Sequence, residues 1–505
     1  MSEILANPYL AAILAYLSAL VLVGLMKARD IKGGDDFMVA GRRLPWTVLV
    51  GTLLATWIGS GSLFAGAGLG YRNGPSALWS GAGAWAAIVL VAFIAKRIRG
   101  FGQVTIPDIF QARYGSTAAG LATLTTVIAY LTIVSYQFKG GGRVLEIVTD
   151  GTISASTGVV ITAAFAILYT VLAGMLSVVY TDVVNGALMI VGCVATLAYM
   201  LWRVGGLEEV IATAEAAGKL ELFGHWASES STGASAPVVA LSIGVPTMLL
   251  LLGDANMYQR IFSARTGGAA KKAVIAWVIG VILLESCISF IGLVGATAAE
   301  QGLISDLGAR GASATEFIIP TIATELAPMA LGLLLVSTMM AVIVSTADSF
   351  LLIPATNLAR NVYQRVSTRA PTEKRVVLIS RALVLALGAL AYLLVDKFPT
   401  ILAAAYTAYL IYGASITPAL LAAFLWRRAT AAGAVASIAS GAVTTLAWKF
   451  WIPAEAMSGW SPILLEPTFP ATALSVLALW AGSLLSSPPP RSDWESQEQP
   501  GMSGV

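Results

Sequence analysis

Residues 55–62 read ATWIGSGS and lie in the middle of a hydrophobic stretch that runs from about 47 to 70. Two glycines and two serines interrupt there a segment that is otherwise long enough to cross a bilayer as a helix. A second hydrophobic stretch, 237–258, is interrupted in the same way by LGDAN at residues 252–256. Irregular backbone at mid-membrane depth is tolerated only where it lines a cavity or meets a ligand. The alternative is that Gly59 and Gly61 only pack helices together, but packing does not explain the carboxylate of Asp254.

The whole chain is built of such apolar stretches: 57% of its 505 residues are hydrophobic and only 11% are charged. We therefore expect an all-α polytopic membrane protein with about 13 transmembrane helices in the lipid bilayer. The predicted spans are 8–26, 47–70, 76–95, 117–146, 155–173, 178–202, 237–258, 273–297, 317–355, 376–394, 399–424, 431–452 and 468–486.

The two interrupted spans are the second and the seventh, so they lie five helices apart. An odd repeat length inverts the second copy, and we expect helices 2–6 (about 47–202) and 7–11 (about 237–424) to form inverted repeats. Paired interruptions in two such halves point to the central site of a secondary transporter. We expect a single transmembrane domain over residues 1–486. The tail 487–505 is rich in Pro, Ser and Glu, which predicts disorder.

Lys and Arg are distributed unevenly between the two sets of loops. One set carries 21 of them, including Arg260 and Arg360, and the opposite set carries five. The positive-inside rule places the N-terminus outside and the C-terminus in the cytoplasm, in the plasma membrane or the inner membrane of a bacterium. The net charge of +3 reflects this loop bias and predicts no nucleic-acid partner.

Residues 345–349 read STADS inside the apolar segment 329–354. Positions 345, 346, 348 and 349 lie close to one face of a helix, where three hydroxyls and a carboxylate can converge. Such hard oxygen ligands suit a small cation. The alternative is that the hydroxyls bond back to carbonyls four residues earlier, as they often do in membrane helices.

Three separated motifs carry a resemblance to a known family: residues 55–61, residues 174–182 (GMLSVVYTD) and residues 341–361. About residues 5–455 resemble the sodium:solute symporters, the group of bacterial proline, pantothenate and sialic acid carriers and animal glucose and choline transporters. TWI at 56–58, YTDVV at 180–184 and STADS at 345–349 are most similar to the choline-transporter branch.

This resemblance implies a leucine-transporter-like core of two inverted five-helix repeats that works by alternating access, with Na⁺ as the coupling ion. It also implies one sodium between the second and ninth helices. The ligands implied are the carbonyls of Ala55, Ile58 and Val342 and the hydroxyls of Ser345 and Thr346. Unwinding at Gly59 would free the carbonyls of the preceding turn.

A second sodium site, found in some members, would map to Asp182, Ser345, Asp348 and Ser349. Two carboxylates facing one cation could tighten that site, or could admit a proton instead. The alternative for Asp182 is a salt bridge to Arg260 or Arg360.

The solute pocket of this fold lies beside the two interruptions. Its candidate residues are Trp57, Ser60, Gln137, Asp254 and Asn256, with Tyr136, Trp79 and Trp85 as further neighbours. Aromatic rings and a buried Asp suit an amine.

Lys139, Arg143 and Glu146 complicate this assignment. They either form a charged group at the outer interface or, if Lys139 reaches the pocket, make an amino acid or an organic acid equally suitable.

We therefore expect a sodium-coupled importer of a small polar organic solute, with a proton-coupled symporter or a non-transporting sensor as alternatives. One inward sodium charge gains about 2.3 kcal/mol per 100 mV. The sequence has a single histidine, and neither a set of His and Cys with metal-ligand spacing nor a nucleophile–base pair, so we do not expect an enzyme.

Overall fold

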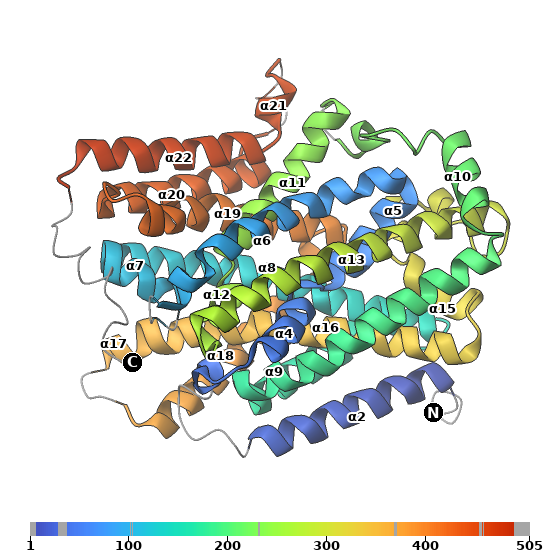
Figure 1. Cartoon of the computed structure of the whole chain (residues 1–505), viewed down its shortest axis with the longest axis horizontal. Coiled ribbons are helices and arrows are strands. Elements are labelled where there is room, and N and C mark those ends of the chain that lie inside the picture. Colours follow the sequence, from blue (N-terminus) through green and yellow to red (C-terminus); the bar gives the residue numbers. More distant parts are fainter. Residues whose placement is uncertain are drawn as a thin grey trace.

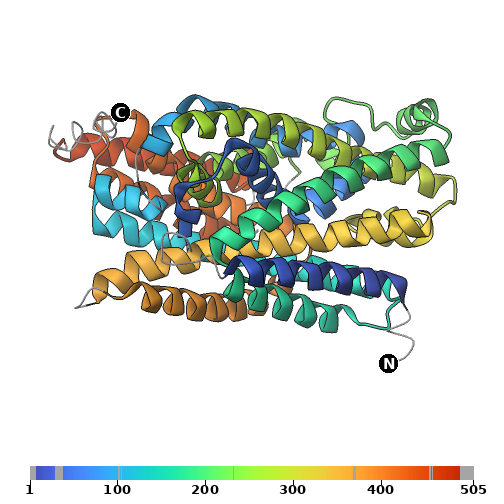
Figure 2. The same ribbon diagram turned by 60° about the horizontal axis from the view of Figure 1, so that its bottom comes forward.

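The structure is a computed structural model that describes residues 7–28, 38–100, 103, 105–230, 233–367, 371–453, 457 and 459–488. The secondary-structure elements of these residues are all helical, apart from one isolated bridge between Leu44 and Ala264. The long helices run roughly along the horizontal axis of Figure 1 and lie in several layers in Figure 2. The predicted disordered tail lies outside the described residues from 489 onward.

The helices follow the chain in this order. They are α2 (Pro8–Ala28), α4 (Trp46–Trp57), η2 (Gly61–Gly66), α5 (Ala67–Asn73), α6 (Trp79–Gly100), α7 (Ile106–Tyr114), α8 (Ser116–Val148), α9 (Ala155–Arg203), α10 (Leu207–Ala216), α11 (Ala236–Gly253), α12 (Ala255–Ser263), α13 (Gly267–Glu300), α14 (Ala312–Thr315), α15 (Ile318–Glu325), α16 (Met329–Asn357), η6 (Leu358–Tyr363), α17 (Gln364–Val366), α18 (Glu373–Leu393), α19 (Ile401–Leu425), α20 (Ala431–Leu446), α21 (Pro462–Leu465) and α22 (Thr468–Leu485).

Among the described residues, 11 helices are long and apolar enough to cross a membrane, and two shorter apolar helices cover 8–24 and 46–57. The predicted count of 13 is therefore not confirmed, although the all-helical class is. Two of the predicted spans, 155–173 and 178–202, lie in the continuous element α9. Gly174 adopts a positive φ of 66° inside that element and separates its two apolar halves, 155–172 and 177–203.

Both predicted helix interruptions are confirmed by the backbone. Helix α4 ends at Trp57, because Ile58 is extended (φ −77°, ψ 99°), and helical structure resumes in η2. Helix α11 ends at Gly253, because Asp254 is extended (φ −63°, ψ 115°), and α12 begins at the next residue. In each case the interruption lies inside an apolar stretch rather than at its end.

Helices α8, α16 and α19 form the centre of the molecule. In their most apolar 18-residue windows, 83% of the residues of α19 and 67% of those of α8 and of the segment containing α16 are buried. Figure 1 shows α20 and α22 along the upper edge and α2 along the lower edge. The two interrupted helices therefore meet α8, α16 and α19 in the interior.

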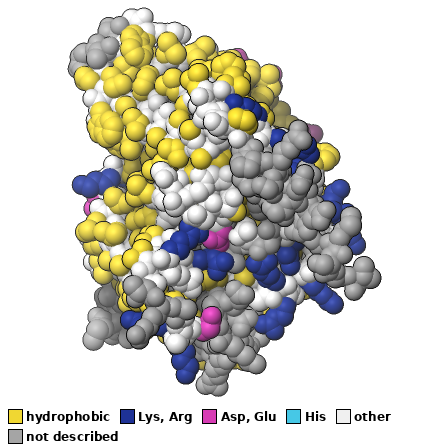
Figure 3. Space-filling view, turned by 90° about the vertical axis from the view of Figure 1, so that its left-hand side faces the viewer, with side chains coloured by type: hydrophobic (Ala, Val, Ile, Leu, Met, Phe, Trp, Pro, Cys, Tyr) yellow, Lys and Arg dark blue, Asp and Glu magenta, His cyan; other side chains and the backbone are white. Residues whose placement is uncertain are grey.

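Lys and Arg side chains gather over part of the left-hand end of the molecule, as Figure 3 shows. Several cations of the predicted cytoplasmic loops lie in helices, and Arg260 is the most deeply buried example. Arg260 lies inside α12 and its side chain is only 1% exposed, so its place in the loop count was wrong. The orientation of the two ends stays a prediction.

Candidate functional site

The hydroxyls of α16 meet the carbonyls that the interruption of α4 leaves without helical partners. Ser345 Oγ lies 3.3 Å from the carbonyl oxygen of Ala55, and Thr346 Oγ1 donates a hydrogen bond to the carbonyl of Ile58 over 3.2 Å. Both hydroxyl residues are at most 2% exposed. Oxygens from two stretches of chain about 290 residues apart are thus brought to one buried point.

The interruption is held in place by Gln137 of α8. Gln137 Oε1 accepts hydrogen bonds from the backbone N–H of Ser60 (2.9 Å) and from its hydroxyl (2.5 Å). Gly59 is needed for this close approach, since a Cβ atom there would lie 2.8 Å from Gln137 Nε2 and 2.9 Å from Thr346 Cγ2. Ser60 and Gln137 therefore stabilise the irregular backbone that exposes the carbonyls.

Asp182 of α9 lies next to these hydroxyls and is completely buried. Its two oxygens accept hydrogen bonds from Ser345 Oγ (2.5 Å) and Thr52 Oγ1 (2.6 Å). Arg260 Nη2 is 3.2 Å from Asp182 Oδ2, so of the two arginines considered, Arg260 forms the salt bridge. Arg360 pairs instead with Asp108 over 2.7 Å.

The guanidinium of Arg260 also contacts Ser349. Arg260 Nη2 donates to Ser349 Oγ over 2.8 Å, and its Nε donates to Thr52 Oγ1 over 2.9 Å. Asp348 faces a different partner, Thr170 of α9, whose hydroxyl donates to Asp348 Oδ1 over 2.7 Å. The guanidinium of Arg260 therefore contacts two of the residues predicted to bind a second sodium.

Asp254 caps α12. Its carboxylate accepts the backbone N–H groups of Asn256 (3.3 Å) and Met257 (3.0 Å), and Tyr130 donates its hydroxyl to Asp254 Oδ1 over 2.5 Å. Side-chain oxygens at an N-cap satisfy the free N–H groups of the first helical turn in this way. The carboxylate thereby holds the second interruption, as Gln137 holds the first.

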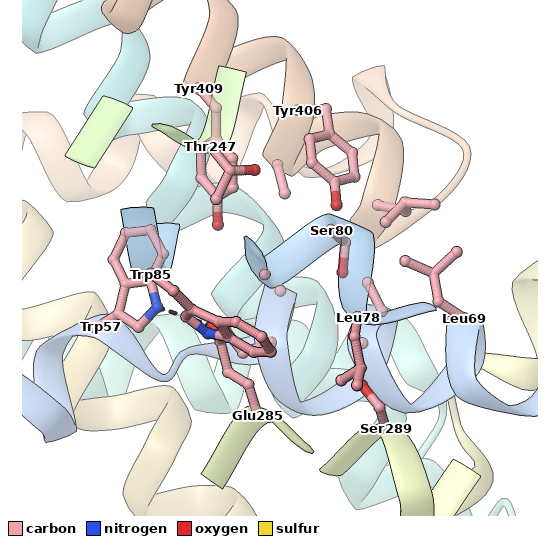
Figure 4. Close-up of a pocket in the computed structure, with 17 residues that line it drawn as sticks. Trp57, Leu69, Leu78, Ser80, Trp85, Thr247, Glu285, Ser289, Tyr406 and Tyr409 are labelled. Atoms are coloured by element: carbon pink, nitrogen blue, oxygen red, sulfur yellow. Dashed lines mark hydrogen bonds between the residues drawn. The ribbon is translucent and has the colours of Figure 1, made fainter. Parts of the chain in front are cut away.

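A cavity lies beside the first interruption, and Figure 4 shows the side chains that surround it. Its polar centre is Glu285 of α13: Trp57 Nε1 donates to Oε1 over 2.9 Å and Trp85 Nε1 donates to Oε2 over 2.6 Å. The lining residues are Trp57, Gly61, Ser62, Ala65, Gly66, Leu69, Leu78, Ser80, Gly81, Trp85, Thr247, Glu285, Ser289, Leu402, Ala405, Tyr406 and Tyr409. Both ends of the cut helix, with α6, α11, α13 and α19, thus contribute to one pocket.

The structure divides the predicted pocket residues into two groups. Trp57 and the further neighbour Trp85 line the cavity, whereas Ser60, Gln137, Asp254 and Asn256 are not among its lining residues. Trp79 stacks on Phe223 with ring centroids 5.3 Å apart. Tyr136 lies behind the cavity wall, its hydroxyl 3.4 Å from that of Tyr409.

The charged group at the end of α8 does not line this cavity. Lys139 Nζ donates to the carbonyls of Phe398 (2.6 Å) and Pro399 (3.2 Å). Arg143 forms an ion pair with Glu146 on its own helix and lies over the ring of Phe317, 5.2 Å from its centroid. Of the two interpretations, the structure favours a charged group outside the pocket.

Glu285, Tyr406 and Tyr409 were not found by sequence reasoning. Glu285 had a signal, because it is an acidic residue inside the apolar span 273–297, and an ionisable residue at that depth is a functional candidate by default. Tyr406 and Tyr409 had none, since aromatic residues in an apolar helix face lipid, core or cavity with the same sequence pattern.

Comparison with known proteins assigns this architecture to a family. A model of the sodium:solute symporter family matches residues 37–441. The sodium/proline symporter of Haemophilus influenzae is 26% identical over 96% of this chain and 95% of its own length. The human high affinity choline transporter 1 is 25% identical over 86% of this chain and 75% of its own length. The chain spans only 62% of the Drosophila melanogaster choline transporter, to which it is 27% identical.

Solved structures of transporters share the fold. A Na⁺-coupled sialic acid symporter in a substrate-bound, outward-open state superposes with a TM-score of 0.81, at 19% identity, over 95% of this chain and 98% of that one. The nucleobase-cation-symport transporter Mhp1 superposes with a TM-score of 0.59 at 14% identity, over 92% of this chain and 98% of that one. The predicted leucine-transporter-like fold class is therefore confirmed. The chain belongs to the sodium:solute symporter family: it is a multi-pass membrane transporter with Na⁺ as its coupling ion, and it is not an enzyme.

Proposed function

We propose that this protein imports a small polar organic solute together with Na⁺ by alternating access. The observation that carries the proposal is the meeting of the Ser345 and Thr346 hydroxyls with the carbonyls of Ala55 and Ile58. The direction of transport follows from the proposed orientation, with the N-terminus outside and the C-terminus in the cytoplasm of a plasma membrane or bacterial inner membrane.

The sodium ligands in this proposal are five neutral oxygens. They are the carbonyls of Ala55, Ile58 and Val342 and the hydroxyls of Ser345 and Thr346. Val342 precedes Thr346 by one turn of α16, so its carbonyl lies on the same side of that helix. A shell without a formal charge holds Na⁺ weakly enough for the ion to leave on the side where sodium is scarce.

We propose one coupled sodium rather than two. Asp182, Ser345, Asp348 and Ser349 were the candidates for a second site, but Asp182 and Ser349 both contact the guanidinium of Arg260. This resident cation neutralises Asp182, and a second cation there would meet its positive charge. Ser345 is already a proposed ligand of the first site, and Asp348 has a single hydroxyl partner.

The solute site in this proposal is the cavity beside the first interruption. Trp57 belongs both to that cavity and to the end of α4 that carries the proposed sodium ligands, so the two proposed sites share one helix end. Ser60, Gln137 and Asp254 act by holding the two interruptions, and Asn256 accepts a hydrogen bond from Arg260 Nη1 over 3.5 Å. Rocking of the proposed repeats, 47–202 against 237–424, would open the cavity to either side.

Uptake into proteoliposomes tests this function. The purified protein, reconstituted without other proteins, should accumulate labelled proline or choline, the solutes in the names of its relatives, or a related small solute. Accumulation should require an inward Na⁺ gradient and should stop when K⁺ replaces Na⁺. Accumulation of a solute that is indifferent to sodium would contradict the proposal.

Proton-coupled symport is the second candidate function. Glu285 and Asp348 favour it, because in the described part of the chain neither carboxylate pairs with a basic side chain. Replacing the Na⁺ gradient in the same proteoliposomes by an inward proton gradient separates the two candidates.

A further inference from the structure

We propose that Glu285 is the specificity-determining residue of the solute site and that it binds a positively charged ammonium group on the solute. This inference rests on the proposed function, since it names the chemistry of the solute that the cavity accepts. Glu285 is not one of the proposed sodium ligands, and it contacts the first interruption through the indole of Trp57.

The carboxylate of Glu285 is presented to the cavity by its neighbours. The indole N–H groups of Trp57 and Trp85 each bind one of its oxygens, at 2.9 and 2.6 Å, and so fix the plane of the group (Figure 4). Gly81 lets α6 come close, since a Cβ atom there would lie 2.6 Å from Glu285 Oε2. An ionised carboxylate has about four acceptor sites, and the two indoles use two of them.

The charge on Glu285 lacks a counterion among its neighbours. None of the residues that line the cavity is Lys, Arg or His, and none of the ion pairs in the described part of the chain involves Glu285. Two N–H donors aimed at both oxygens favour the form in which both oxygens are acceptors, which is the carboxylate. A buried carboxylate without a counterion is unfavourable in an apolar interior, and a cationic ligand would supply that counterion.

The walls of the cavity suit an organic cation better than a bare metal ion. Trp57 and Tyr409 are stacked with ring centroids 6.5 Å apart, and Tyr406 lies edge-on to Tyr409 at 5.8 Å. With Trp85, four aromatic side chains surround the space in front of the carboxylate. Aromatic rings attract ammonium groups electrostatically, and more strongly when water is excluded.

The negative charge of Glu285 discriminates among the amines, amino acids and organic acids that the sequence left open as solutes. An organic acid would bring a second negative charge into a cavity whose lining has no cation, and like charges in such a site repel strongly. An amine or the ammonium group of an amino acid instead pairs with Glu285. The solute class is therefore one that carries an ammonium group.

Equilibrium binding to the purified protein in Na⁺ tests this inference. The probes are tetramethylammonium, choline and proline, with 3,3-dimethylbutan-1-ol as the uncharged isostere of choline and cyclopentanecarboxylate as the analogue of proline that lacks the ammonium. We expect at least one ammonium probe to bind and its partner without the charge to bind roughly 30-fold more weakly. Glu285→Gln should weaken the binding of the ammonium probe by a similar factor and leave the binding of the uncharged isostere unchanged. Glu285→Asp should keep part of the affinity for the ammonium probe.

The second readout is sodium binding in the absence of solute, which is measured as the Na⁺-dependent shift in the thermal midpoint of the protein. It should be unchanged in Glu285→Gln and lost in Ser345→Ala, which separates failure of this inference from failure of the proposed function. Three results would overturn the inference: binding of none of the ammonium probes, equal loss of charged and uncharged probes in Glu285→Gln, or loss of the sodium response in that variant. A Glu285→Gln protein that keeps ammonium affinity but loses pH-dependent transport would assign Glu285 to proton coupling instead.

Discussion

At the scale of single residues, two hydroxyls account for the proposed sodium site. In the apolar interior, Ser345 and Thr346 could have bonded to carbonyls of their own helix, as Thr123, Thr196 and Thr321 do. Thr346 contacts instead the carbonyl of Ile58 at the end of α4, and Ser345 donates to Asp182 while it lies 3.3 Å from the carbonyl of Ala55. The partner of each hydroxyl, rather than its presence in the sequence, distinguishes the site.

Replacing Thr346 by valine removes one hydroxyl while keeping the shape of the side chain. We expect Thr346→Val to raise the sodium concentration for half-maximal binding or transport by roughly tenfold, because one ligand of a charged group is lost. Thr346→Ser keeps the hydroxyl and should stay within a factor of about three. Sodium titration of the thermal midpoint measures both. Equal behaviour of the two variants would show that the hydroxyl is not a ligand.

Replacing Asp254 tests whether this residue caps a helix or binds solute. As a cap, Asp254→Asn should keep the stability of the protein, because Asn is as good an N-cap as Asp. Asp254→Ala should destabilise it by about 0.5–2 kcal/mol. Thermal denaturation in detergent, together with solute binding, distinguishes the roles. A stable Asp254→Asn protein with lost solute affinity would contradict the capping role.

Residue-scale prediction from the sequence succeeded where a local rule applied and failed where the partner was distant. The hydroxyls at 345 and 346 and the break at Gly59 follow from composition within one span. The salt bridge of Asp182 was left open, because nothing in the order of residues says which arginine folds next to it. Arg260 was counted as a loop residue, since its position near a span end could not reveal that α12 carries it into the core.

At the scale of elements, the interrupted helices are held open by side chains of other elements. Gln137 of α8 binds the backbone after the first break, and Tyr130, also of α8, binds the backbone and the carboxylate at the second (N–H of Ala255 to the Tyr130 hydroxyl, 2.9 Å). The sequence predicts both breaks, because Gly, Ser and Asp are poor residues for an apolar helix. It could not predict that one helix supports both.

The close approach of α16 and α8 to the first break requires a glycine at position 59. Gly59→Ala should lower sodium affinity several-fold, because its Cβ atom would come within 2.9 Å of Thr346 Cγ2 and displace that side chain. Gly280→Ala is the matched control: it also faces α4, but its Cβ atom meets Leu54 at an ordinary 3.5 Å. Sodium titration of both variants should separate them, and an unchanged Gly59→Ala protein would contradict the close packing.

The buried ion pair between α9 and α12 gives a prediction about stability. Removing one partner alone, by Asp182→Asn or Arg260→Met, should destabilise the protein by about 3–5 kcal/mol, since the other charge is left uncompensated. The double variant should recover part of the loss. Thermal midpoints of the four proteins form the required cycle. Strictly additive losses would show that the two charges do not depend on each other.

At the scale of the whole molecule, the fold places two kinds of site against one interrupted helix. The end of α4 carries sodium ligands on the side of α16, and Trp57 at the same end lines the cavity on the side of α13 and α19. Helices α2, α20 and α22 lie at the periphery (Figure 2) and contribute no lining residue. The helix class could be predicted from composition, whereas the cavity could not, because it is built from residues of eight helical elements.

In the proposed mechanism, oxygens of α4 and α16 bind one Na⁺ between them. Equilibrium binding of ²²Na⁺ to the purified protein tests it most directly, comparing the wild type with the Ser345→Ala, Thr346→Val double variant. We expect saturable binding of one ion per chain by the wild type, no displacement by K⁺, and loss of that binding in the double variant while the variant stays folded. Equal ²²Na⁺ binding by the two proteins would contradict it.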